Sequence, residues 1–235
     1  MFNKKISFIV ATLILGASCL WAGDIASFVD LGFSPDGRTY MFAQYGIQAK
    51  TLKPWADLYV VDVPQNNFVA GGRVSYVHDS PANAGQDGSG ALYRVISRNT
   101  ALADRYGINF LIQGLPLYIS LSNDDVYPGP GRGENIEFRD FEQNASYKAS
   151  LVPVVQGSGA SLKSSFSISL ERTGRDGTRK TYTVGTPQLQ RPLIDSYRIR
   201  RVITAPRDGL IFVIETRKLT DEGYDIRFMI ETLKL

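Results

Sequence analysis

The stretch GFSPDGRTYMFAQYGI, residues 32–47, joins a tight-turn signal to the alternating pattern of a β-strand. Pro35 fixes φ at the first corner of a turn, and Asp36 can accept hydrogen bonds from nearby backbone amides. Gly37 tolerates the positive φ that a tight hairpin requires. On both sides of the turn, apolar and polar residues alternate with the period of a half-buried strand. The stretch therefore predicts a β-hairpin.

The same alternation continues along the chain after residue 22 and indicates a mainly β protein. One segment, GALYRVISRNTALADRYGI, instead places Leu92, Val95 and Leu102 at helical spacing and ends at Gly107, which predicts one amphipathic helix near residues 91–106. We expect strands at residues 27–33, 39–45, 57–63, 74–77, 117–121, 136–141, 147–155, 164–171, 180–184, 196–204, 210–216 and 224–233.

The two ends of the chain share a weak internal similarity. FSPDGRTYMFAQYG is followed by WADLYVVDV near the start, and APRDGLIFVIETRK is followed by GYDIRFMIETL near the end. Both pairs read as a strand after a Pro and Asp-Gly turn, then a loop, then an Asp-containing strand. We therefore expect antiparallel blade-like β-meanders at both ends, which flank a β-sheet region.

The first segment, MFNKKISFIVATLILGASCLWAGD, has the three parts of a secretory signal. Two lysines precede an apolar core, and small residues around Ala22 supply cleavage sites. The apolar run is shorter than the roughly 20 residues that a transmembrane helix needs. We expect a signal peptide over residues 1–22, a single β-rich exported domain over residues 23–235, and no transmembrane span in the mature chain.

Cys19 is the only cysteine of the chain, so an intramolecular disulfide is excluded. Two processing routes stay open. Cleavage after Ala22 would remove Cys19 and release a periplasmic or secreted protein. Alternatively, LGASC resembles a relaxed lipoprotein box, in which Cys19 would be lipidated and would anchor the protein to a membrane, although Gly16 stands where the box prefers Leu.

Charge and residue types exclude several classes of function. Without Lys4 and Lys5, 24 of the 26 basic side chains remain against 23 acidic ones, which is too balanced for a nucleic-acid partner. His78 is the only histidine, so His78 and Asp79 lack the second histidine or nucleophile that a triad or a zinc site requires. Asp87 and residues 123–125 offer oxygen atoms outside the calcium-loop register. We assign no catalytic, cofactor-binding or metal-binding residue and expect no cofactor.

The aromatic residues suggest one contact position. Trp55 follows Pro54 in the loop AKTLKPWADLY, directly before a predicted strand. A tryptophan at such a position either closes the end of a sheet or contacts a ligand. We take Trp55 as the candidate exposed contact residue.

Two resemblances to known families rest on these motifs. FSPDG and LYVVD resemble the hairpins of TolB-type propeller blades. GFSPDGRTYMFAQYGIQ, ADLYVVDV, RYGI, SYRIRRVITAPRDG and EGYDIRFMIETLKL together resemble domain-of-unknown-function family 2259 of predicted secreted bacterial proteins. The second resemblance implies export and transfers no catalytic residue, because the family carries no assigned activity.

These observations favour a non-catalytic exported cell-envelope protein that acts as a binding or scaffold module. Its partner would be an envelope protein or ligand whose identity, like the oligomeric state, the sequence leaves open. One alternative is an envelope hydrolase or lyase that uses carboxylates such as Asp57, Asp62 and Asp79. Another is a lipid-anchored structural protein of the envelope.

Overall fold

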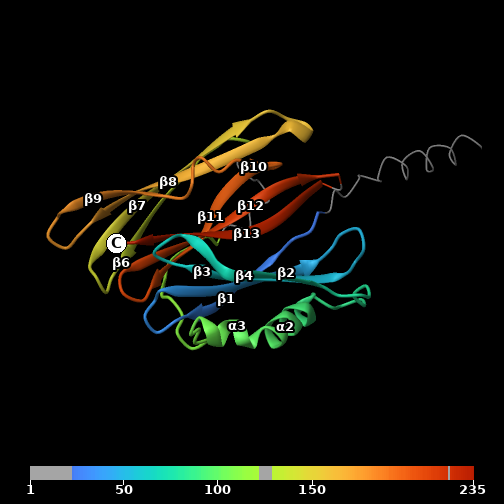
Figure 1. Ribbon diagram of the computed structural model, residues 1–235. Coiled ribbons are helices and arrows are strands. Elements are labelled where there is room, and N and C mark those ends of the chain that lie inside the picture. The colour runs from blue at the N-terminus through green and yellow to red at the C-terminus, as the bar shows by residue number, and fades with distance from the viewer. Residues whose placement is uncertain (1–22, 122–128, 222) are drawn as a thin grey trace, which may run out of the picture.

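The computed structural model describes residues 23–121, 129–221 and 223–235. The predicted signal peptide, Cys19 and residues 123–125 lie outside the described residues. Three antiparallel sheets are stacked face to face, and two short helices cover the outer face of one of them (Figure 1). The prediction of a mainly β chain with meanders at both ends is confirmed.

The first sheet is a meander of four strands in chain order. Its strands are β1 (Ser27–Phe33), β2 (Thr39–Ile47), β3 (Pro54–Asp62) and β4 (Asn67–Val77). Gly32 has a φ of 117° and forms a bulge against β2. Because the bulge breaks the two-residue period, Leu31 packs toward the helices while Phe33 packs toward the next sheet.

The helical segment covers the outer face of the first sheet in two pieces, α2 (Ser89–Arg98) and α3 (Thr100–Arg105). Asn99 separates them, and its side-chain amide donates to the carbonyl of Val95 at 2.7 Å. The predicted amphipathic helix is thus present with a break inside it. Ala91, Leu92 and Val95 are buried against the strands, as the helical spacing of apolar residues requires.

The middle sheet contains the C-terminal meander. Its strand order is β13 (Gly223–Lys234), β12 (Gly209–Thr220), β11 (Ile194–Ala205) and β5 (Pro116–Ile119). One face packs on the first sheet through a cluster that includes Phe33, Phe42 and Ile211. The other face packs on the third sheet through a cluster that includes Phe212 and Phe166. Because both faces are covered, β12 is apolar along most of its length.

The third sheet contains the central strands of the chain. These are β6 (Glu134–Asp140), β7 (Ala145–Gln156), β8 (Lys163–Thr173), β9 (Arg179–Val184) and the short β10 (Arg191–Pro192), with a 3-10 turn at Gly159–Ser161 between β7 and β8. Side chains on β7 alternate between buried and exposed positions, so one face meets the middle sheet and the other meets solvent. Each predicted strand corresponds to an observed one, and only β10 was not predicted.

The opening turn has the geometry that its residues predict. Gly37 has a φ of 66°, and the carboxylate of Asp36 accepts a hydrogen bond from the amide of Arg38 at 3.0 Å. The turn that echoes it near the C-terminus differs, because Arg207 and Asp208 carry the positive φ values there. The two turns touch, since a Cβ on Gly37 would lie 2.3 Å from the carbonyl oxygen of Pro206.

Candidate functional site

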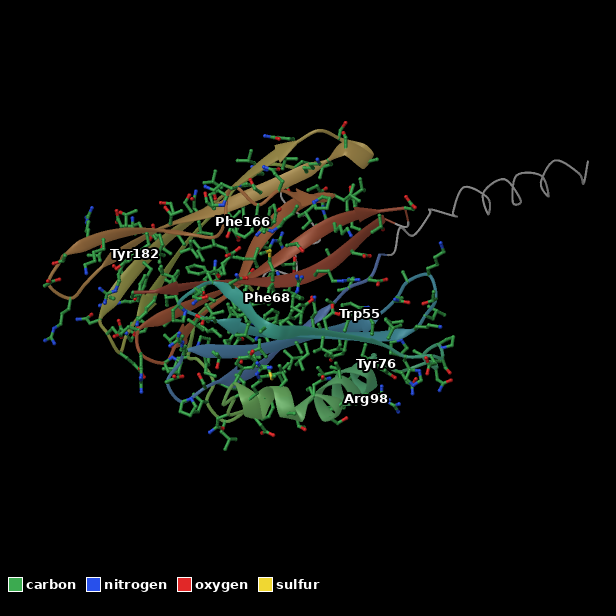
Figure 2. The ribbon with its side chains drawn as sticks, in the orientation of Figure 1. Trp55, Phe68, Tyr76, Arg98, Phe166 and Tyr182 are labelled. Atoms are coloured by element: carbon green, nitrogen blue, oxygen red, sulfur yellow. The ribbon has the colours of Figure 1, made fainter. Side chains whose placement is uncertain are left out.

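A groove of about 400 Å³ lies at the outer edge of β13, between the first and third sheets. Figure 2 shows Phe68 and Phe166 on opposite sides of the middle sheet, whose edge strand forms the floor of the groove. The first sheet contributes Val61, Gln65, Asn66, Asn67 and Phe68, the loop before β10 and β10 itself contribute Thr186, Leu189 and Arg191, and β13 contributes Met229, Ile230 and Glu231.

The edge of β13 presents backbone groups to this groove. The amide of Ile226 donates to the carbonyl of Asp24 at 2.8 Å. Further along, the amide of Phe228 donates to the Gln44 side chain at 2.8 Å, and that of Thr232 donates to the Asn66 side chain at 2.7 Å. Outward N–H groups on an edge strand recur every second residue, and the pairing of β12 with β13 has no register shift. The N–H of Ile230 therefore also points outward, into the groove.

A buried ion pair lines part of the groove. The guanidinium of Arg191 lies 3.3 Å from the carboxylate of Glu231, and the two side chains are 11% and 4% exposed. The Asn66 side-chain amide also donates to Glu231. Burial raises the pKa of the Glu231 carboxyl, although the hydrogen bond from Asn66 and the charge of Arg191 act in the opposite direction. The site therefore holds one charge of each sign, close together and shielded from water.

Asn66 is placed by the turn between β3 and β4. Its φ is 49°, a left-handed conformation that asparagine adopts more readily than most residues. The turn is fixed by the carboxylate of Asp62, which accepts from the amide of Gln65 at 3.0 Å, and by a backbone bond from Asn66 to Val63. The first sheet thus holds the Asn66 side chain against the edge of the middle sheet.

Two apolar side chains form the rim of the groove. Phe68 is 39% exposed and Leu189 is 52% exposed, and they come from the first sheet and from the loop before β10, respectively. The ring centroid of Phe68 lies 5.6 Å from that of Tyr59, and the guanidinium of Arg73 lies 4.5 Å from the Phe68 centroid. These contacts hold an aromatic surface open at the mouth of the groove.

The expected exposure of Trp55 is wrong. Trp55 lies in β3 and is only 5% exposed, because the guanidinium of Arg227 lies 4.2 Å from its ring centroid. Arg227 is held in turn by Asp24 at 3.0 Å and by Asp225 at 3.4 Å. Trp55 therefore closes the end of the sheet, the other role that its position allowed.

The fold does not bring together the three carboxylates that the hydrolase or lyase alternative would use. Asp57 faces Tyr59, whose hydroxyl lies 3.2 Å from the carboxylate, and burial followed by the charge of Asp57 raises the pKa of Tyr59 to about 12. Asp62 serves the turn described above. Asp79 follows His78 just after β4, where Asp79 is exposed and His78 is half-buried, and the imidazole contacts the backbone of Ser80.

The remaining candidate residues, His78 and Asp87, make only local contacts. His78 borders a surface hollow of about 600 Å³ beside the start of α2. Asp87 accepts a hydrogen bond from the amide of Ser89, the first residue of α2, at 2.9 Å, which fixes the turn before the helix. Among the described residues, no three His, Cys, Asp or Glu side chains are grouped as a metal site would require. Within the same ranges, no helix is both long and apolar enough to cross a membrane.

Comparison with known proteins identifies the family. A family model described as predicted secreted protein (DUF2259) matches residues 41–234, so the chain belongs to that family. No curated protein and no solved structure matches the chain significantly. The resemblance to TolB-type blades therefore has no support from a structural neighbour.

Proposed function

We propose that this member of the DUF2259 family is a non-catalytic cell-envelope protein, located in the periplasm or secreted, that acts as a binding or scaffold module. The observation that carries the proposal is the groove at the edge of β13, which offers outward backbone groups and a rim of exposed apolar side chains. Pockets with apolar walls and a few convergent polar groups are the usual places for ligand binding. The enzyme alternative has less support, because Asp57, Asp62 and Asp79 lie at separate positions.

Photocrosslinking from within the groove tests this function. A benzophenone amino acid placed at Phe68 should form a reproducible adduct with an envelope component in intact cells. The matched control is the same amino acid at Phe141, which is 82% exposed on the turn after β6. An adduct from Phe68 only would identify a partner of the groove. An absence of adducts from both positions, and from a general crosslinking pull-down of the envelope, would reject the binding or scaffold function.

The stacked meanders are also part of the proposal. Face-to-face packing of antiparallel meanders is the arrangement of successive propeller blades, so we propose that the first sheet is a blade of the TolB type. An experimental structure would test this idea. Superposition of β1 to β4 on such blades should align all four strands in order, and a different twist or order would reject the likeness.

Lipid anchoring through Cys19 remains a separate proposal. Residues 24–26 bond to the edge of β13 at Ile226, so the five residue steps from Cys19 to Asp24 would keep Asp24 within about 18 Å of a lipidated Cys19. Palmitate labelling of the wild type should then be strong and that of Cys19→Ala absent. Equal labelling of the two, or none in either, would support cleavage after Ala22 instead.

A further inference from the structure

One residue from the segment before β1 already pairs with the edge of β13. Ile25 forms an isolated parallel bridge with Ile226, in which the Ala26 amide donates to the carbonyl of Ile226 at 3.1 Å and the Ile226 amide donates to Asp24. This bridge shows that the geometry of the edge suits main-chain pairing by a single extended residue.

The next open position on that edge lies in the groove. Side chains of Gln44 and Asn66 occupy the amides of Phe228 and Thr232, and among the described residues no partner is found for the amide of Ile230 between them. Ile230 lies about 13 Å along the strand from Ile226, at the rise of about 3.3 Å per residue. Between these two occupied amides, the edge offers one open outward donor, the amide of Ile230, beside the outward carbonyl of the same residue.

The walls of the groove set the character of what fits there. Val61, Phe68, Leu189 and Met229 give it apolar sides. Its two buried charges, on Arg191 and Glu231, neutralise each other. An added charge would lose water without gaining an unpaired counter-charge, whereas an apolar side chain beside a main-chain amide would be accommodated.

We propose that the groove binds an extended, uncharged segment of a partner polypeptide, which pairs its main chain with the N–H and C=O of Ile230. The segment adds one bridge to the edge of β13, and its neighbouring side chains contact Phe68 and Leu189. This is strand addition in its shortest form, in which main-chain bonds give affinity and the walls give selectivity. The inference rests on the proposed function and specifies the partner of the same groove.

Selection from a random peptide library displayed on phage tests the proposal. The exported chain is the bait, and the enriched peptides are measured on the wild type, on Leu189→Asp and on the matched control Leu111→Asp. Leu111 is 92% exposed outside the groove. We expect uncharged sequences whose binding falls at least about tenfold on Leu189→Asp and is unchanged on Leu111→Asp.

Two further measurements separate main-chain pairing from simple apolar contact. Methylation of one internal amide nitrogen of a selected peptide should weaken binding about tenfold, since it removes a hydrogen bond donated to the edge. Bound peptide should also slow hydrogen exchange at the Ile230 amide and leave the Ile226 amide, already bonded within the chain, unchanged.

Several results would overturn the inference. One is enrichment of peptides that bind Leu189→Asp as tightly as the wild type. Another is a peptide affinity that does not change when any of its amides is methylated. A third is slower hydrogen exchange at the Ile230 amide with soluble glycan fragments and not with peptides. A crosslinked partner found at another surface, together with any of these results, would leave the binding function standing and reject only the groove as its peptide site.

Discussion

At the scale of single residues, glycine positions decide how closely the sheets approach one another. Gly37 combines a φ of 66° with contact against the carbonyl of Pro206, so its missing side chain serves both the turn and the packing of two turns. Any residue with a Cβ at this position would have a strained backbone and would also clash with the carbonyl of Pro206.

We expect Gly37→Ala to lower the free energy of unfolding by about 2–4 kcal/mol, because strain at positive φ adds to the clash with Pro206. Gly71→Ala is the matched control, since Gly71 has a φ of 69° and a Cβ added there would meet no atom within 4 Å. That control should cost only about 1 kcal/mol. Urea unfolding measures both, and equal losses would show that contact with Pro206 contributes nothing.

Glu231 makes the folding stability of the protein depend on pH. Its folded-state pKa is raised, chiefly by burial, above the ordinary value of 4.5. The folded state therefore binds the proton more tightly than the unfolded state, and the resulting stabilisation is fully present below about pH 4.5 and is lost as pH rises through the folded pKa.

Relative to Glu231→Gln, the wild type should gain stability as the pH falls from about 7.5 toward 4.5, because only the wild type titrates at this position. Thermal unfolding across that range measures the difference between the two proteins. Glu137→Gln removes the same charge from an exposed side chain and serves as the control. A constant difference between wild type and Glu231→Gln would contradict the raised pKa.

At the scale of elements, the segment before β1 behaves as a short extra strand of the middle sheet. Arg227 fixes this segment, since its guanidinium bonds to Asp24 and covers the ring of Trp55. The ion pair is partly shielded, with side chains 26% and 13% exposed. Partial shielding strengthens such contacts compared with pairs in open solvent.

We expect Arg227→Ala to lower stability by about 1–3 kcal/mol and to speed hydrogen exchange at the amides of Ala26 and Ile226, because the segment loses its clamp. Lys148→Ala breaks an exposed pair with Glu137 and should cost no more than about 0.5 kcal/mol. If exchange at Ala26 and Ile226 stays at the wild-type rate, the backbone bonds hold the segment without Arg227.

At the scale of the whole molecule, the middle sheet shares apolar clusters with both outer sheets. We propose that residues 23–235 form one cooperative domain, because neither outer sheet can lose the middle sheet without exposing a core. Trp55 is the only tryptophan after residue 22 and reports on the first sheet, whereas far-ultraviolet circular dichroism reports on all three.

The two signals should therefore follow the same urea unfolding curve. A second circular-dichroism transition, after the fluorescence of Trp55 has already changed, would show that the third sheet unfolds separately and that the chain has two domains. The control is a measurement at two protein concentrations, which excludes a contribution from association.

The sequence predicted the elements well because their signals are local. Alternation located the strands, helical spacing located α2 and α3, and the turn at residues 34–37 has the expected geometry. The break at Asn99 was not predicted, because it involves a side-chain bond to Val95 that the spacing of apolar residues does not reveal. The bulge at Gly32 was not predicted, because Gly32 meets the backbone of Asn109 from another part of the chain. The burial of Trp55 was missed for the same reason, since Arg227 covers it from β13.

The candidate groove could not be predicted in this way. Asn66, Arg191 and Glu231 come from three sheets, and the pattern around each one is that of an ordinary turn or strand. The local sequence gives one sign of the site, because Glu231 is a single carboxylate within the mostly apolar run FMIETL. By itself the sequence determined the antiparallel meanders, because turn chemistry and hydrophobic periodicity act between near neighbours. Only the tertiary structure decided which edge stays open and which charges meet, because stacking of the sheets brings together residues that are far apart in the chain.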